Sequence, residues 1–113
     1  MRGHSFNRRL ILSKSTRITD GAGGFVREWR EQGAFWANVT MRSGDLKHTE
    51  FGRTPRLRVR IITHAIPDGH AMRPTTGDRL IDGGRTYEVQ AVHDDESHLL
   101  SILASEVPPG EPV

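Results

Sequence analysis

The side chains best suited to chemistry lie in one short acidic stretch near the C-terminus. The segment His93-Asp94-Asp95-Glu96-Ser97-His98 gathers imidazole and carboxylate groups, which are common metal ligands. A metal site needs such groups to converge with a defined geometry, whereas surface turns between strands often carry acidic residues for solubility alone. We therefore expect neither a metal nor any other cofactor here.

A glycine-rich stretch is the second candidate for a binding site. Gly21, Gly23 and Gly24 stand close together, as they do in phosphate-binding loops. Those loops lead into a helix with a set spacing and, in one class, a lysine. Here the chain continues from Phe25 to Trp29 with a strand-like pattern, so the stretch predicts a turn between two strands.

The remaining reactive residue types form no catalytic arrangement. The chain has no cysteine, which excludes disulfides, thiolate nucleophiles and cysteine-based zinc sites. His64 and His70 bracket a turn without a third partner, no serine stands in a nucleophile elbow, and no carboxylate pair flanks an evident pocket. The sequence predicts a protein that is not an enzyme.

Length and composition predict one small globular unit. The chain has 113 residues, of which 35% are hydrophobic and 27% charged, enough for a single modest core. It has no apolar run that could span a bilayer, and the apolar part of its N-terminal segment, Leu10 to Leu12, is too short for a signal peptide. We expect synthesis in the cytoplasm and no membrane partner. A domain of this size without disulfides often gains stability by oligomerising.

Charge is distributed unevenly along the chain. Five basic residues precede Asp20, the first acid: Arg2, Arg8, Arg9, Lys14 and Arg17. Beyond Arg85 the chain has no lysine or arginine, but it carries Glu88, Asp94, Asp95, Glu96, Glu106 and Glu111. This asymmetry suits head-to-tail contact between copies or contact with nucleic acid, and an ordinary solvated surface is the alternative.

Hydrophobic alternation and turn residues predict a chain made of strands. The expected strands are Leu10–Ile18, Phe25–Met41 (one strand, or two with a bulge or bend at Gly33), Pro55–His64, a hairpin over residues 78–92 turning at Asp82-Gly83-Gly84, and a largely buried Leu99–Val107. The fold class is all-β, a small β-barrel or sandwich of about six strands with long loops and at most one short helix. Residues 1–107 form the domain, and 108–113 a proline-rich tail.

Alternation also predicts which side chains point inward. In the second strand, Phe35, Ala37 and Val39 share one face and Trp36 lies on the other, so both faces of that strand should be covered. The hairpin should place Tyr87, Val89 and Ala91 on one face and Glu88, Gln90 and Val92 on the other, with Tyr87 inward and its hydroxyl near the rim. We expect Trp36, Arg85 and Tyr87 to serve the core or the sheet.

Two features fall outside this plain pattern. Arg56, Arg58 and Arg60 share the face opposite Leu57, Val59 and Ile61 at a spacing of about 7 Å, so they require water, phosphates or acidic partners. The polar segment 42–54 could form one short helical turn over Leu46–Phe51, and a segment this long in a small domain is often functional.

Three blocks of sequence together resemble a known family. They are FWANVTMRSG, LRVRIITH and GDRLIDGGRTYEVQAVHDDESHLLSILASEV. In this order and spacing they are similar to the phage head–tail joining family, the head-closure or stopper proteins of long-tailed phages, whose relatives also occur in gene transfer agents. The resemblance covers roughly Leu10 to Val107. The long connection Ala65–Thr76 departs from the family's usual short link, which leaves the local path there open.

The resemblance implies a structural role in the neck of a phage-like particle. Such proteins form a ring between the portal with its adaptor ring and the tail terminator ring, retain packaged double-stranded DNA, and pass it on at delivery. Six copies are favoured over twelve. The family's channel loop corresponds here to Arg42, Ser43, Gly44, Asp45, Leu46, Lys47, His48, Thr49 and Glu50.

Physical constraints refine this expectation. A ring of identical subunits needs two different patches in contact, so we expect Arg56, Arg58 or Arg60 to meet Asp94, Asp95 or Glu96 of a neighbour. A channel that gripped DNA phosphates tightly would jam, so Arg58 and Arg60 should lie outside the lumen. The alternatives are a tail terminator or other connector ring, and a free-standing nucleic-acid-binding β-barrel with stacking aromatic residues.

Overall fold

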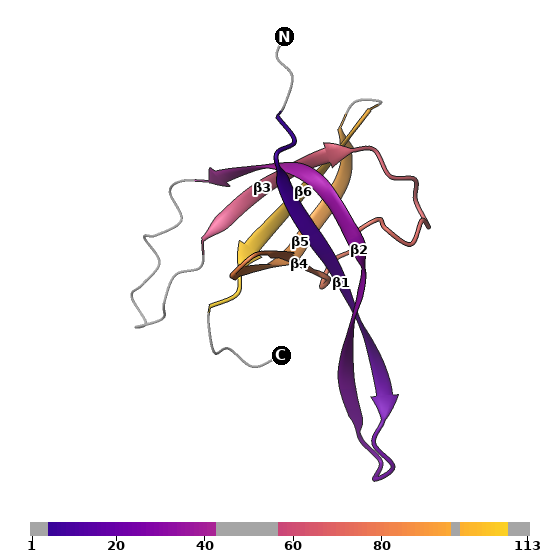
Figure 1. Ribbon diagram of the computed structural model, residues 1–113. Helices are drawn as coiled ribbons and strands as arrows, with labels where there is room; N and C mark the ends of the chain where they lie inside the picture. The colour runs from indigo at the N-terminus through magenta and orange to yellow at the C-terminus, as the bar shows by residue number, and fades with distance from the viewer. Residues whose placement is uncertain (1–4, 43–56, 96–97, 109–113) are drawn as a thin grey trace.

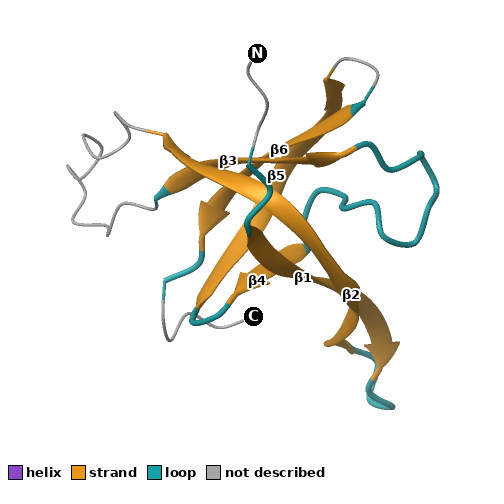
Figure 2. Ribbon diagram, turned by 45° about the horizontal axis from the view of Figure 1, so that its top comes forward, coloured by secondary structure: helices purple, strands orange, loops and turns teal. Residues whose placement is uncertain are grey.

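The computed structural model describes residues 5–42, 57–95 and 98–108 of the chain, and in these residues it contains strands and no helix (Figures 1 and 2). The strands are β1 Arg8–Thr19, β2 Phe25–Arg42, β3 Arg58–His64, β4 Arg79–Asp82, β5 Arg85–Asp95 and β6 Leu99–Glu106. The predicted all-β class with about six strands is therefore confirmed, and β2 is one long strand.

All neighbouring strands pair antiparallel and close into a barrel in the order β1-β2-β3-β6-β5-β4. Closure depends on β4, which pairs with Ile11, Leu12 and Ser13 of β1. The bulge expected at Gly33 is present: Leu12 lies opposite Gly33 but Ser13 lies opposite Glu31, so one residue of β2 has no partner there. Such a bulge bends a strand and increases its twist.

Beyond this bulge, β1 and β2 continue as a two-stranded ribbon that projects from the barrel (Figures 1 and 2). We call residues 14–31 the hairpin arm. Its strands pair with one another from Lys14 opposite Arg30 to Thr19 opposite Phe25. The glycine-rich stretch that could have resembled a phosphate loop is the turn at its tip, where Gly21 and Gly23 have positive φ.

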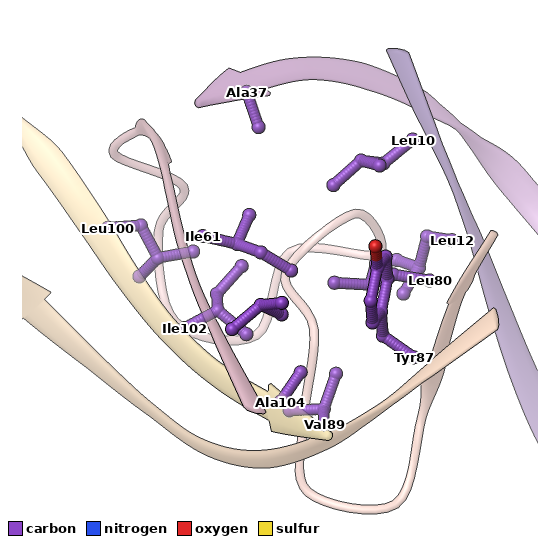
Figure 3. Close-up of a cluster of buried hydrophobic side chains, with 11 residues drawn as sticks. Leu10, Leu12, Ala37, Ile61, Leu80, Tyr87, Val89, Leu100, Ile102 and Ala104 are labelled. Atoms are coloured by element: carbon purple, nitrogen blue, oxygen red, sulfur yellow. The ribbon is translucent and has the colours of Figure 1, made fainter. Parts of the chain in front are cut away.

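The core fills the barrel with aliphatic side chains from every strand (Figure 3). On β3, Val59 and Ile61 are fully buried while Arg58 and Arg60 are exposed, as the alternation predicts. The other buried members are Leu10, Leu12, Ala37, Leu80, Tyr87, Val89, Leu100, Ile102 and Ala104. The last strand is largely buried, as expected.

The alternation predicted for β5 is wrong after Val89. The pairing of β5 with β6 shifts between Val89 and Ala91, so Gln90 is an extra residue in the strand. A one-residue shift moves all following side chains to the opposite face. Val92 rather than Ala91 therefore packs against the core.

Two aromatic residues also differ from expectation. The Tyr87 hydroxyl lies inside the barrel rather than near the rim, because the whole side chain is inaccessible to solvent (Figure 3). Trp36 lies on the outer face of β2, where its side chain is 54% exposed. The prediction that both faces of β2 are covered therefore fails for the single chain, and Trp36 is a sheet residue outside the core.

The two long connections have different outcomes. The short helical turn predicted over Leu46–Phe51 lies outside the described residues. In the connection 65–76, the expected turn at Pro67 is present, since the His70 amide donates to the Pro67 carbonyl at 3.0 Å and Gly69 has a φ of 85°.

The part of the chain that the structure describes holds no helix able to cross a membrane.

Ser101 provides a stability prediction. Its Oγ atom is buried without a hydrogen-bond partner, a state that costs about 1–3 kcal/mol. We expect Ser101→Ala to raise the free energy of unfolding by about 1 kcal/mol, as measured by urea denaturation. The control is Ser105→Ala, because Ser105 Oγ accepts a hydrogen bond from Gln90 Nε2 at 3.1 Å. A gain in both variants, or in neither, would contradict this account.

Candidate functional site

The predicted channel segment begins at the end of β2. Arg42 is the last residue of that strand, and its backbone pairs with Arg58 at the start of β3. The chain therefore leaves the barrel and returns to it at the same end, with residues 43–57 between the two strands. Ser43 to Glu50, the rest of the predicted channel loop, lie outside the described residues.

The predicted interface residues lie along one wall of the barrel, made of β3, β6 and β5. Arg58 lies opposite Ser105 near one end of this wall, and Asp95 lies opposite Leu99 near the other. Arg58, Arg60 and Asp94 are exposed and Asp95 is half-buried, whereas Arg56 and Glu96 lie outside the described residues. The basic and acidic groups are thus separated along the strands of one chain.

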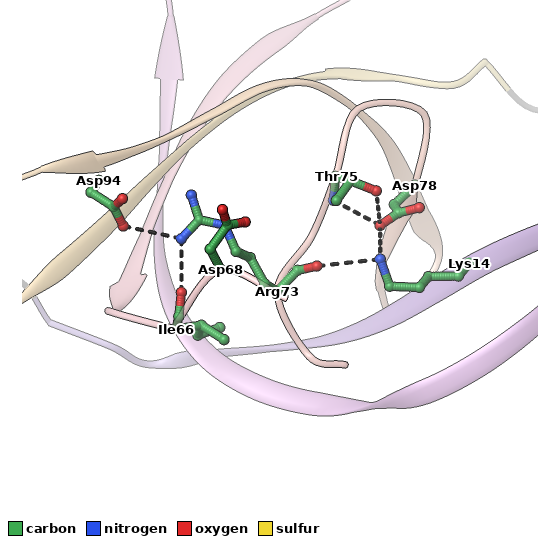
Figure 4. Close-up of polar contacts among 7 residues, drawn as sticks. All are labelled: Lys14, Ile66, Asp68, Arg73, Thr75, Asp78 and Asp94. Atoms are coloured by element: carbon green, nitrogen blue, oxygen red, sulfur yellow. Dashed lines mark hydrogen bonds and ion pairs between the residues drawn. The ribbon is translucent and has the colours of Figure 1, made fainter. Parts of the chain in front are cut away.

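Asp94 already has a partner within its own chain. Arg73 Nη1 donates to Asp94 Oδ1 at 3.1 Å and to the Ile66 carbonyl at 2.8 Å (Figure 4). Arg73 Nε also lies 3.9 Å from the carboxylate of Asp68. The Arg73 side chain is only 13% exposed, so it fastens the connection 65–78 to the end of β5.

A second polar contact fastens the same connection to β1. Asp78 Oδ2 accepts hydrogen bonds from Lys14 Nζ at 2.6 Å, from the Thr75 amide at 2.8 Å and from Thr75 Oγ1 at 3.1 Å (Figure 4). Lys14 Nζ also donates to the Arg73 carbonyl at 3.2 Å. These contacts define the path that the sequence left open over Ala65–Thr76.

The bulge in β2 contributes to this fastening. A Cβ atom at Gly33 would lie 3.0 Å from Met72 Sδ, and Gly33 has a φ of 152°. The positive φ favours glycine at this position, and the missing Cβ leaves room for the Met72 side chain of the connection. Lys14, Arg73 and Asp78 were not foreseen as a group, because no local pattern links residues 64 positions apart.

The tip of the hairpin arm has its own polar contact. Asp20 Oδ1 accepts hydrogen bonds from the Ala22 amide at 2.8 Å and the Gly24 amide at 3.0 Å. These two bonds hold the pKa of Asp20 below its ordinary value, because they stabilise the ionised carboxylate. The carboxylate therefore stays ionised, and accepts both bonds, to a lower pH than an ordinary aspartate would.

The described surface offers little to a small ligand. One hollow, lined by Arg58, Val59, Gln90, Leu103 and Ala104, has a volume of about 130 Å³. Small-molecule sites usually span roughly 300–1,000 Å³. Among residues 5–42, 57–95 and 98–108, no three His, Asp or Glu side chains are placed to hold a metal ion. The polar contacts of Arg73, Asp78 and Asp20 described above stabilise the fold.

Comparison with known proteins assigns the family. The family model of the phage head completion protein matches residues 1–107. The chain belongs to the phage head completion protein family. This membership confirms the resemblance inferred from the three sequence blocks, and it gives the protein a structural, non-enzymatic role in the head–tail region of a phage-like virion.

Two solved structures extend this assignment. A chain in the virion of a native gene transfer agent particle is 39% identical, with a TM-score of 0.74, and the match covers 89% of this head completion protein and 94% of that chain. The solution structure of protein SF1141 from Shigella flexneri 2a is 19% identical, with a TM-score of 0.71 over 99% of this chain and 100% of that one, and shows the fold alone. A search of curated proteins finds no match.

The contact between Lys14 and Asp78 generates a stability prediction. Asp78→Ala leaves a partly buried lysine without its carboxylate, so we expect the free energy of unfolding to fall by about 2–3 kcal/mol in urea denaturation. Arg30→Gln is the matched control, since Arg30 lies 3.7 Å from Glu28 at the surface and should contribute no more than about 0.5 kcal/mol. Equal effects of the two substitutions would refute the role assigned to Asp78.

Proposed function

We propose that this head completion protein is the head-closure, or stopper, ring of the connector. In this proposal six copies lie between the portal adaptor ring and the tail terminator ring, retain the packaged double-stranded DNA, and let it pass to the tail. Residues 1–107 act as the ring-forming domain, and the tail 108–113 is dispensable for closure. The observation that carries the proposal is the likeness of nearly the whole chain to a component of a gene transfer agent virion.

The connection between β2 and β3 supports the choice of a closure role. Adjacent antiparallel strands need only a short turn, yet residues 43–57 separate these two. Loops of this length in small domains are usually functional. We assign the channel contact to Arg42–Glu50 within this connection.

The charges of this segment suit a gate rather than a clamp. Over residues 42–54, the basic Arg42, Lys47 and Arg53 are offset by Asp45 and Glu50. Affinity for DNA rises steeply with each phosphate neutralised, so a near-balanced segment contacts DNA without holding it. Arg58 and Arg60 lie outside the lumen in this proposal, on the outward face of β3.

The subunit contact in the proposed ring joins unlike patches. Arg58 and Arg60, with Arg56 beside them in the sequence, meet Asp94, Asp95 or Glu96 of the neighbouring copy. A contact between two different patches closes into a ring when the rotation between subunits allows it. A tail terminator would use the same kind of contact, so the position in the particle decides between these two connector rings.

Shortening the connection tests the closure role. Replacing residues 43–54 by a four-residue Gly-Ser linker should release packaged DNA while leaving the rings assembled, because the barrel strands remain intact. DNA retention is measured by nuclease protection of purified particles, and ring occupancy by electron microscopy. The control is truncation after Val107, which should leave retention unchanged. Full retention of packaged DNA by the shortened variant would refute the gate role of this segment.

Imaging of intact particles tests the subunit contact and the copy number. We expect six copies, with the side chains of Arg58 or Arg60 within about 4 Å of Asp94 or Asp95 of the next copy, the usual distance of an ion pair. A reconstruction in which these groups lie far apart would reject the pairing.

Strong, salt-sensitive binding of single-stranded DNA by the monomer would instead favour the free-standing nucleic-acid-binding barrel.

A further inference from the structure

The hairpin arm is exposed in a way that the isolated chain does not explain. β4 pairs with β1 only as far as Ser13, and β3 pairs with β2 only from Asn38. Within the part of the chain described, residues 14–31 therefore have no third strand beside them. A two-stranded ribbon is marginally stable in water by itself, so an arm of this length gains from a surface that covers it.

Both faces of the arm carry exposed apolar side chains. Ile18 lies opposite Val26 on one face, and they are 40% and 51% exposed. Phe25, which is 57% exposed, lies on the other face. These three are among the five large hydrophobic residues exposed in the described structure, so the arm gathers most of that exposed apolar surface. Such gathering marks an interaction site.

The face that carries Phe25 is also basic. Arg17 lies directly opposite Arg27, and like charges in that position destabilise a strand pair. Aromatic rings support the two guanidinium groups, with Arg17 4.4 Å from the Phe25 ring centre and Arg27 5.1 Å from that of Trp29. Neither arginine forms an ion pair with any carboxylate of the described residues.

The same face extends back to the barrel wall. Arg79 of β4 lies 4.7 Å from the ring centre of Trp29, so Trp29 contacts one arginine of the arm and one of the barrel. Arginine and aromatic residues are enriched in the centres of protein interfaces. By contrast, Arg30 on the opposite face is neutralised by Glu28 at 3.7 Å. The arm therefore has one face prepared for acidic groups.

The arm is also held in shape before any partner arrives. Its tip is fixed by the two hydrogen bonds to Asp20 and by the Asp20 amide, which donates to the Gly24 carbonyl at 3.1 Å. A segment that is ordered in advance loses less conformational entropy on binding. The carboxylate of Asp20 at the tip would repel the phosphates of a nucleic acid, so a protein surface is the better partner for the arm.

The chain itself carries the complementary surface. Asp68, Asp94 and Asp95 form what we call the acidic end, where the fully exposed carboxylate of Asp68 and the largely exposed one of Asp94 share Arg73. The hairpin arm leaves the barrel at one end, and β5 and β6 meet at the other (Figures 1 and 2). An arm therefore reaches the acidic end of a second copy rather than its own.

We propose that the basic face of the hairpin arm, built on Arg17, Arg27, Phe25 and Trp29, binds the acidic end of a second copy of this chain. This contact rests on the proposed ring. Asp94 and Asp95 also belong to the proposed barrel-wall contact, so the arm of the neighbouring copy shares these carboxylates with its Arg58 or Arg60, whereas the Arg17→Glu and Arg27→Glu variant affects the clasp alone. The contact joins unlike patches, so it can be repeated around an axis. Phe25 and Trp29 supply its apolar area, and the two arginines set its register.

Charge reversal tests the clasp on the full-length chain in solution. Sedimentation velocity of the wild type should show self-association that weakens as salt is raised, because the contact joins opposite charges. Arg17→Glu with Arg27→Glu should lower the association constant at least tenfold, and so should Asp68→Lys with Asp94→Lys. Mixing these two double variants should restore association, since each then supplies what the other lacks. Arg30→Gln, on the opposite face of the arm, should leave association unchanged.

Several results would overturn the clasp. Unchanged self-association of the arginine variant would do so, as would a wild type that stays monomeric at millimolar concentration or a failure of the mixed variants to associate. A loss of salt-sensitive DNA binding in the arginine variant, with self-association unchanged, would assign the face to nucleic acid instead. Melting curves of each variant show whether it is folded. DNA retention by the particle is read separately, so the closure role can stand if the clasp fails.

Discussion

The structure depends on three residues of β1 that pair with strands on both sides. Ile11, Leu12 and Ser13 bond to β2 on one edge and to β4 on the other, and β4 has only four residues. Without this short ladder the sheet would stay open, with β1 and β4 as unpaired edges that face solvent. The ion pair of Lys14 with Asp78 lies directly beside the closure, where it holds the connection 65–78 against β1. The core and the walls that carry the candidate interface residues follow from this closure.

The same three residues divide the molecule into two parts with different roles. On one side of them, every strand is paired with two neighbours around a core of buried hydrophobic side chains. On the other side, β1 and β2 leave the barrel as the hairpin arm, where Arg17 and Arg27 form no ion pair with a carboxylate of the described residues and the side chains near the tip stay exposed. A head completion protein is a component of a larger particle, and this division is suited to that setting. The barrel holds the core, whereas the arm keeps exposed apolar and basic side chains outside it.

Much of the fold follows from alternation and turn residues. Val59 and Ile61 point inward and Arg58 and Arg60 outward because a strand has a period of two, and Asp82-Gly83-Gly84 turns a hairpin because glycine accepts positive φ. The errors arise where the period is broken. The extra residue Gln90 moves Val92 into the core. The amino-acid type at a single position does not predict such a bulge. The fastening of Arg73 and Asp78 was missed for another reason, since it joins residues distant in the sequence. The channel segment could be named only by resemblance, and the arm only from the structure.

The pairing of β4 with β1 also determines when the barrel can close during synthesis of the chain. β1 is complete at Thr19, but β4 is complete only at Asp82, so one edge of the first strand stays open while the intervening chain is synthesised. At ribosomal rates of about 5–20 residues per second, this wait lasts roughly 3–13 seconds. During it, the early hairpin of β1 and β2 is the nascent chain's most exposed pairing surface, and neighbouring ribosomes on one message would present several such hairpins together. Bulges and charged side chains on an open edge oppose pairing between chains, and this hairpin carries both before the barrel can close.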